Sequence, residues 1–167
     1  MKMRLSLVAS LLAGAVLLAA CAAESSGPPL YSSLARSDAK VDAGEASSLI
    51  NRHREIAGLR PLVIDAALMR EAQAHASDMA AAEKIGHDIS RGNLKSRLTA
   101  GGVALGVAAE NVGAGYHTLA EAFSGWRGSP PHDKNLLLPE GKRMGIAAAY
   151  AQGSKYKVFW AFIVAGD

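Results

Sequence analysis

The chain has 167 residues, half of them hydrophobic, and its 18 basic and 15 acidic side chains give a formal net charge of +3. It has no run of basic residues and few aromatic ones, so it lacks the usual signature of a nucleic-acid-binding protein. Because Cys21 is the only cysteine, an intrachain disulfide is also excluded, and the fold must depend on its hydrophobic core.

The first 20 residues predict an export signal that is not part of the fold. Lys2 and Arg4 precede an uncharged apolar run of 16 residues, which is shorter than the roughly 20 residues of a membrane-spanning helix. The run ends in Leu18-Ala19-Ala20-Cys21, which resembles the cleavage box of bacterial lipoproteins. We therefore predict a lipoprotein signal peptide over residues 1–20 and lipidation at Cys21. An ordinary signal peptide with an incidental cysteine is the alternative.

The predicted anchor places the protein in the cell envelope, with the membrane as its partner. Ala22, which is not acidic, follows the cysteine. In Gram-negative lipoproteins this usually goes with delivery to the outer membrane, facing the periplasm. Loss of Lys2 and Arg4 with the signal lowers the net charge from +3 to +1. The Ser-, Pro- and Gly-containing stretch that follows predicts a flexible tether over residues 21–43 and a domain over residues 44–167.

The domain shows the patterns of both helices and strands. Helical apolar periodicity and end signals occur in five segments: residues 44–58, 65–83, 93–100, 119–128 and 132–138. Strand patterns occur at residues 107–113, 144–151 and 157–165. The last two strands flank Gln152-Gly153-Ser154 and should pair as an antiparallel hairpin. The prediction is an α+β fold, a three-layer α/β/α sandwich with helices on both faces of a small antiparallel sheet.

Three motifs in the second half of the chain contain the candidate site residues. His87 follows Gly86 just beyond the long second helix, where a glycine permits a sharp exit. Glu110 lies in a small-residue strand, where a buried carboxylate is costly without a partner. His132 follows Ser-Pro-Pro and begins a helical turn. Together these side chains form a candidate metal-ligand or acid–base set.

The order and spacing of these motifs resemble the bacterial branch of the CAP family, also called the SCP-like extracellular domain. Its pattern is a histidine, then Glu-Asn, then Ser-Pro-x-His-x-x-Asn-(Ile/Leu)-Leu, and the match covers roughly residues 46–165. The resemblance implies the α/β/α sandwich and assigns ligand positions to His87, Glu110 and His132. Pro131 stands where bacterial relatives usually have glycine. Ser129 stands where animal and plant relatives have a second glutamate.

Two histidines and one glutamate resemble a three-ligand site for a divalent metal such as zinc. If one ion binds all three, the ring nitrogens of His87 and His132 should lie within roughly 8 Å of each other. Glu110 should then be in hydrogen-bond reach of one of these rings. The same residues are the candidates for any catalytic role.

Other polar residues in the predicted helices and strands have structural interpretations. His75, on the apolar face of the second helix, is interpreted as a core or helix-packing residue, and His53 is interpreted similarly. The Asn111 side chain is expected to bind local backbone groups and not a ligand. Trp126 is expected in the core. Ser129 is poorly supported as a nucleophile because the Gly-x-Ser-x-Gly elbow is absent.

Three functional hypotheses remain open. The first is a non-catalytic envelope module whose His/Glu cleft binds a small ligand, a lipid or a cell-wall component, with or without a divalent metal. The alternative is a metal-assisted hydrolase acting on peptide or cell-wall material, although no spare carboxylate is evident to activate water. A purely structural lipoprotein is the third. The sequence does not specify the ligand or the oligomeric state.

Overall fold

The computed structural model describes residues 29–104 and 106–166. The predicted signal peptide and Cys21 lie outside these residues. The described helices are η1 (Pro29–Tyr31), α1 (Ala43–Ile56), α2 (Ala66–Ala82), α3 (Leu94–Ala100), α4 (Leu119–Arg127) and α5 (Pro130–Leu136). The strands are β1 (Val63–Ile64), β2 (Ala108–Ala114), β3 (Arg143–Tyr150) and β4 (Val158–Ala165). All five helices and three strands predicted from the sequence are present, with bounds within two residues of those expected.

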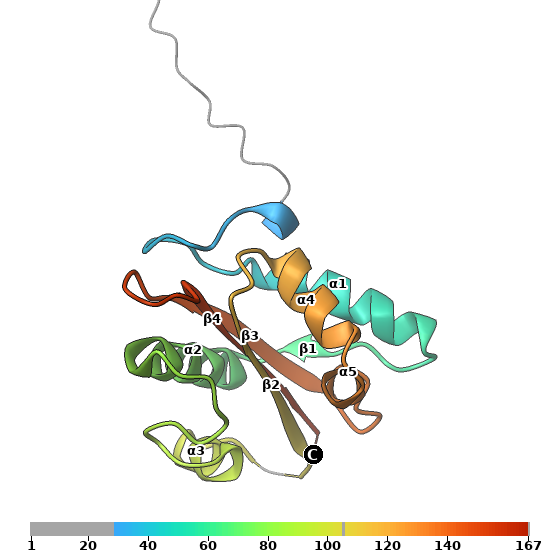
Figure 1. Ribbon diagram of the computed structural model, residues 1–167. Helices are drawn as coiled ribbons and strands as arrows, with labels where there is room; N and C mark the ends of the chain where they lie inside the picture. Colours follow the sequence, from blue (N-terminus) through green and yellow to red (C-terminus); the bar gives the residue numbers. More distant parts are fainter. Residues whose placement is uncertain (1–28, 105, 167) are drawn as a thin grey trace, which may run out of the picture.

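The three-layer arrangement is confirmed. Figure 1 shows the sheet in the middle, with α2 and α3 on one side and α1, α4 and α5 on the other. Strand β4 is buried along its whole length, and its side chains alternate between two cores. Phe159 and Ile163 pack with α2, whereas Trp160 and Phe162 pack with α1 and α4. The unbroken apolar run of this strand reflects its burial on both faces.

The sheet has the order β1-β3-β4-β2. Strand β4 pairs antiparallel with both β2 and β3, so the predicted hairpin is present. One edge differs from the prediction. Strand β1, for which no strand pattern was found in the sequence, pairs parallel with β3, so the sheet is mixed. A strand of two residues is too short to produce an alternating pattern in the sequence.

The segment before α1 is another difference. Residues 29–42, predicted to belong to the tether, pack against the domain. Leu34 is only 8% exposed and joins the core beside α1 and α4. Its backbone N–H donates to the carbonyl of His117 at 2.7 Å, and Asp42 caps α1 by accepting from the N–H of Glu45. The folded domain therefore begins before residue 44. In the sequence, the prolines and serines of the segment mask its few well-placed apolar side chains.

Candidate functional site

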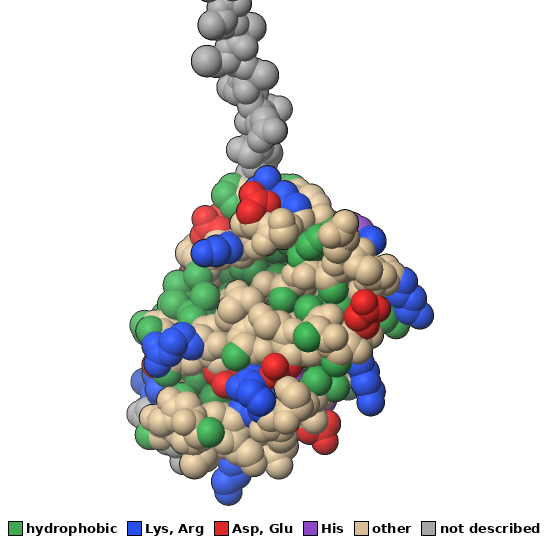
Figure 2. Space-filling view, turned by 90° about the vertical axis from the view of Figure 1, so that its left-hand side faces the viewer, with side chains coloured by type: hydrophobic (Ala, Val, Ile, Leu, Met, Phe, Trp, Pro, Cys, Tyr) green, Lys and Arg blue, Asp and Glu red, His purple; other side chains and the backbone are tan. Residues whose placement is uncertain are grey.

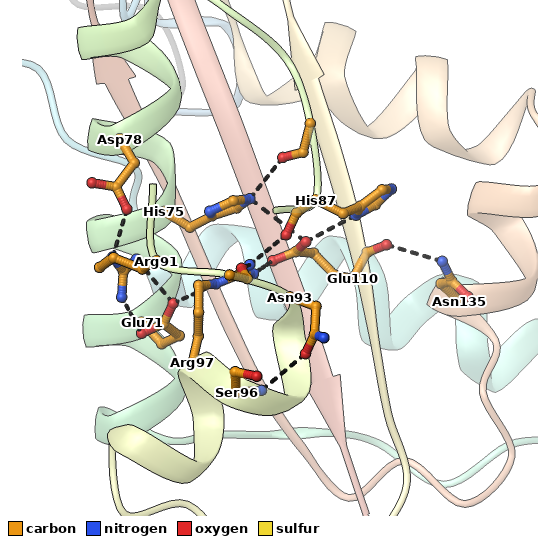
Figure 3. Close-up of polar contacts among 12 residues, drawn as sticks. Glu71, His75, Asp78, His87, Arg91, Asn93, Ser96, Arg97, Glu110 and Asn135 are labelled. Atoms are coloured by element: carbon orange, nitrogen blue, oxygen red, sulfur yellow. Dashed lines mark hydrogen bonds and ion pairs between the residues drawn. The ribbon is translucent and has the colours of Figure 1, made fainter. Parts of the chain in front are cut away.

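The site is built around Glu110, in the middle of β2. Its side chain points to the α2–α3 side of the sheet and is 1% exposed. One carboxylate oxygen, Oε1, contacts the guanidinium of Arg97. The other, Oε2, accepts a hydrogen bond from Nδ1 of His87 at 2.9 Å. Figure 3 shows His87 and Arg97 approaching the carboxylate from different elements. The predicted contact between Glu110 and a candidate histidine is therefore present.

Arg97, on α3, holds the surroundings of this carboxylate together. Its side chain is fully buried, and its Nε donates to Glu71 of α2 at 2.9 Å. Its Nη1 donates to the backbone carbonyls of His87 and Gly92. A single guanidinium therefore connects α2, β2 and the loop that carries His87. Because an arginine has five N–H donors in a rigid fork, it can satisfy several elements at once.

The network of charges continues to the surface through Arg91. This arginine makes two hydrogen bonds to Glu71, at 2.9 and 3.0 Å, and another to Asp78. These carboxylates raise the pKa of Arg91. The three carboxylates and two guanidiniums of the network leave one negative charge when the histidines are neutral.

His75, on α2, lies beside this network. It is fully buried, as expected of a core histidine, but its Nε2 lies 3.6 Å from Oε2 of Glu110. The same nitrogen donates to the carbonyl of Gly86 at 2.9 Å and so fixes the start of the loop. Burial, followed by repulsion from Arg97, lowers the pKa of His75 to about 4. His75 is thus a neutral support for the site at physiological pH.

Glu110 has opposing influences on its pKa. Burial is the largest and raises the pKa, whereas the charge of Arg97 and the hydrogen bond from His87 lower it. Desolvation disfavours a charged carboxylate, and direct contact with a guanidinium offsets much of that penalty. The carboxylate therefore depends on its partners for its charged state.

His132 lies on α5 and belongs to a different set of contacts. Its Nδ1 is 2.9 Å from the hydroxyl of Ser129, and its carbonyl accepts from the side chain of Asn111 at 3.0 Å. Asn135 bridges to the Asn111 side chain at 2.9 Å and to the Glu110 carbonyl at 3.1 Å. Within the described residues, no hydrogen bond or ion pair joins the His132 ring to Glu110. The link between them runs through the backbone and the two asparagines.

A second histidine–carboxylate pair lies on the same side of the sheet as His132. Nε2 of His53, on α1, is 2.7 Å from Asp133 of α5, and the His53 ring meets Phe123 edge-on at 5.8 Å. Asp133 thus orients His53, a contact that the sequence did not indicate. In the part of the chain that the structure describes, the adjacent His132 ring pairs with Ser129 and not with Asp133.

The described arrangement does not fit a divalent metal. Across residues 29–104 and 106–166, no group of three or more His, Cys, Asp or Glu side chains is placed to hold one. Both oxygens of Glu110 have partners, and Arg97 contributes a permanent positive charge where a cation would sit. The three candidate ligands thus form a histidine–carboxylate pair and a separate histidine.

Sequence reasoning missed Arg97, Glu71 and Arg91. A local signal for the network was nevertheless present in α2. Glu71, His75 and Asp78 have the i, i+4, i+7 spacing of one helix face, and all three belong to or border the network. A polar stripe on a buried helix indicates partners from other elements. The identity of those partners could not be read from the spacing.

Comparison with known proteins shows the family of the chain. Residues 48–164 match the family model described as the cysteine-rich secretory protein family, CAP. The chain therefore belongs to the CAP family. It is 31% identical over 99 residues to the uncharacterized protein YkwD of Bacillus subtilis, a match that covers 59% of this chain and 38% of YkwD.

Solved structures show the same fold. An extracellular protein containing an SCP domain from Bacillus anthracis is 28% identical, with a TM-score of 0.65, over 74% of this chain and 40% of that protein. An outer surface protein from Borrelia burgdorferi has a TM-score of 0.67 at 19% identity, over 77% of this chain and 97% of its own. The chain spans about two fifths of the length of the two Bacillus relatives.

These similarities are compatible with an envelope or secreted location, since the solved Bacillus anthracis relative is extracellular. Of the helices that the structure describes, none is long and apolar enough to cross a membrane.

Proposed function

We propose that the chain is a lipid-anchored CAP domain of the bacterial cell envelope whose His87–Glu110 site binds a ligand without catalysing a reaction. One observation carries the proposal. The His87 side chain is 58% exposed, but it is held through Nδ1 by a carboxylate that is 1% exposed. A buried acceptor fixes the ring and leaves its outer edge facing solvent. This is the arrangement of a preorganised binding group.

The tautomer indicates what such a group would bind. An ionised carboxylate can only accept hydrogen bonds, so Nδ1 of neutral His87 carries the hydrogen and Nε2 presents a lone pair. The ligand should therefore supply a donor, such as a hydroxyl, an amide N–H or an ammonium group. The residual negative charge of the network favours such donors over anions. Glycan and peptide parts of the cell wall are rich in these groups.

Hydrolysis finds less support in the same contacts. A general base needs a carboxylate or imidazole within reach of a water molecule and a substrate. Both oxygens of Glu110 have partners inside the protein, and a metal ion does not fit beside Arg97. Among the described residues, no hydrogen bond or ion pair joins the His87 ring to a nucleophile or to a second carboxylate. Binding therefore accounts for the geometry without the metal ion and the additional catalytic groups that metal-assisted hydrolysis would need.

The binding proposal can be tested by co-sedimentation with purified peptidoglycan, using a Cys21→Ala protein to remove the anchor. His87→Ala should reduce binding several-fold, because it removes the exposed acceptor while leaving the contacts of Arg97 with Glu110 and Glu71 in place. Lys95→Ala, at an exposed position on α3, is the matched control and should bind normally. Equal binding by wild type and His87→Ala would exclude this site. Fragments released from peptidoglycan, detected by mass spectrometry, would instead favour the hydrolase.

Anchoring needs a separate test, in cells. Wild-type protein should be recovered with membranes, and Cys21→Ala protein should be recovered in the soluble or uncleaved pool. Both proteins should have the same thermal stability, because Cys21 lies before the described domain. The same distribution for both would refute lipidation at Cys21.

A further inference from the structure

The attachment of residues 29–42 to the domain limits how far the domain can move from its anchor. The fixed part of the chain includes Leu34, buried at 8% exposure in the core, and Leu30, which packs against the same core. The 3-10 helix η1 contacts both α4 and α1. Any lipid at Cys21 is therefore connected to a rigid point at Pro29.

The connecting chain is short. Only residues 22–28 separate Cys21 from Pro29, and eight steps of extended chain span at most about 29 Å. A tether reaching residue 43 would have spanned up to about 80 Å by the same rule. A domain of this size is itself about 35 Å across, as estimated from its expected radius of gyration. The fully extended connecting segment is thus shorter than the diameter of the domain.

We propose that the η1 end of the domain rests on the membrane, with Tyr31 at the lipid headgroups and the His87 site turned away from the bilayer. The inference depends on the lipid anchor proposed above. Tyr31 is 65% exposed, although its neighbour Leu30 packs against the core. An exposed tyrosine next to a lipid attachment suits the interface, where the ring meets acyl chains and the hydroxyl meets water. The short linker brings the bilayer, and no other partner, to this surface.

The surroundings of Tyr31 are compatible with headgroup contact. Arg36 and Lys40 are exposed, as is Asp38, which forms a 3.7 Å ion pair with Arg36. Figure 2 shows side chains of both charges at the end of the domain where the described chain begins. Such a surface can meet the zwitterionic and anionic headgroups of phospholipids without a strong repulsion of either sign.

The consequence concerns the ligand. In Figure 1, η1 and α3 lie at opposite ends of the domain, and Arg97 of α3 is part of the site network. With η1 on the membrane, the site faces the aqueous side. It would therefore take its ligand from the cell wall or from solution, and not from the bilayer that holds the anchor.

Single labelled thiols can test this orientation. In the mature lipoprotein, the sulfur of Cys21 carries the lipid, so Ser33→Cys and Lys95→Cys each introduce a unique free thiol at an exposed position. Each lipidated full-length protein is labelled with a fluorophore and reconstituted into phosphatidylethanolamine–phosphatidylglycerol vesicles that contain a headgroup spin-label quencher. We expect most of the emission at position 33 to be lost and the emission at position 95 to be unchanged.

Two further variants separate the effect of linker length from the effect of the Tyr31 side chain. A Gly/Ser insertion of about 15 residues after Gly27 should partly restore the emission at position 33, because a longer flexible linker lets the domain leave the surface. Tyr31→Ser should also restore part of it. Val107→Ser is the matched control. The Val107 side chain is exposed, and its backbone carbonyl accepts a hydrogen bond from the N–H of Gly166, beside the C-terminal end of β4. This variant should leave the emission unchanged.

Vesicle flotation distinguishes the two proposals. Wild-type protein that does not float with the vesicles would refute the lipid anchor, and with it the proposed envelope function. Protein that floats but is quenched equally at positions 33 and 95, or more strongly at 95, would keep the anchor and overturn the orientation.

Discussion

The two sides of the sheet are stabilised in different ways. Towards α2 and α3, the sheet covers a buried network of charges in which Glu110 and Glu71 share Arg97. Towards α1, α4 and α5, it covers a larger apolar core, in which Trp126 meets Trp160 edge-on at 6.3 Å. The α2–α3 side has an apolar core of its own and also depends on pairing, because a buried charge without its partner is strongly destabilising. The α1–α4–α5 side depends mainly on packing, and the charged group that it buries, Arg54, donates to backbone carbonyls instead of a carboxylate.

One dipeptide belongs to both sides. Neighbouring residues of a strand face opposite ways, so Glu110 enters the charged network while Asn111 binds the carbonyl of His132 and the side chain of Asn135. This confirms the expectation that Asn111 holds backbone. It also explains why His87 and His132 are not joined at one carboxylate. The Glu-Asn motif serves a histidine on one side and the α5 backbone on the other.

Breaking the charged side should have the largest effect. Arg97→Met would leave Glu71 and Glu110 without their shared partner and should lower the free energy of unfolding by about 4 kcal/mol, measured by urea denaturation. The double variant Arg97→Met/Glu110→Gln should recover part of this loss, since it no longer buries that unpaired charge. A loss below about 1 kcal/mol would show that the network contributes little to stability.

Trp126→Ala tests the apolar side and should cost about 3 kcal/mol. Its side chain is almost fully buried at 1% exposure, and its indole N–H has no partner among the described residues, so the loss is one of packing alone. Unlike the arginine variant, it should lose the same free energy at low and at high salt. A strong salt dependence would contradict the separation of the two sides.

The pH dependence of stability should come mainly from His75 on the charged side. Its pKa is about 4 in the folded protein and about 6.5 when unfolded. Between these values the unfolded state binds a proton that the folded state does not, so stability falls as the pH decreases from about 6.5 to 4. The loss between pH 7 and pH 5 should be about 2 kcal/mol.

Arg97, Arg91, Glu71 and Glu110 surround this histidine, and the raised pKa of Glu110 acts in the opposite direction at pH values above 4.5. The comparison of interest is therefore with His75→Gln, which keeps a donor for the Gly86 carbonyl but cannot titrate. Its stability should change much less between pH 7 and pH 5. Equal pH dependence in both proteins would assign the effect to another group.

The smallest effect is expected at the second histidine–carboxylate pair. Asp133→Asn should cost about 1 kcal/mol, because the side chains of His53 and Asp133 are 19% and 28% exposed and solvent weakens their attraction. Thermal unfolding at neutral pH is the measurement. The variant should leave ligand binding at His87 unchanged, since α2 and β2 are not involved. A large loss would mean that this pair, too, is a structural centre.

A direct test of the metal hypothesis is zinc titration by calorimetry. We expect no specific uptake, because Arg97 occupies the position that a cation would need. Uptake that is lost in Glu110→Gln would instead restore the three-ligand interpretation. Glu110→Gln keeps the shape of the side chain and removes its charge, so a change in binding without loss of folding would identify the carboxylate itself.

The sequence by itself determined most local structure. The 3.6-residue periodicity and caps located the five α-helices, and the alternating and apolar runs located three of the four strands that the structure describes. The motif around Glu110 predicted its contact with a histidine, and the helix face of Trp126 predicted its burial. These features depend on residues close together in the chain, so a pattern in a short window is sufficient to show them.

Only the tertiary structure decided the partners. Arg97 lies 26 residues from Glu71 and 13 from Glu110, and no local pattern states that one guanidinium will serve both. The same is true of the short parallel strand β1 and of residues 29–42, in which Leu34 is buried by distant helices. Whether a charged or apolar side chain finds a partner depends on which elements the fold brings together, and that is a property of the packed chain as a whole.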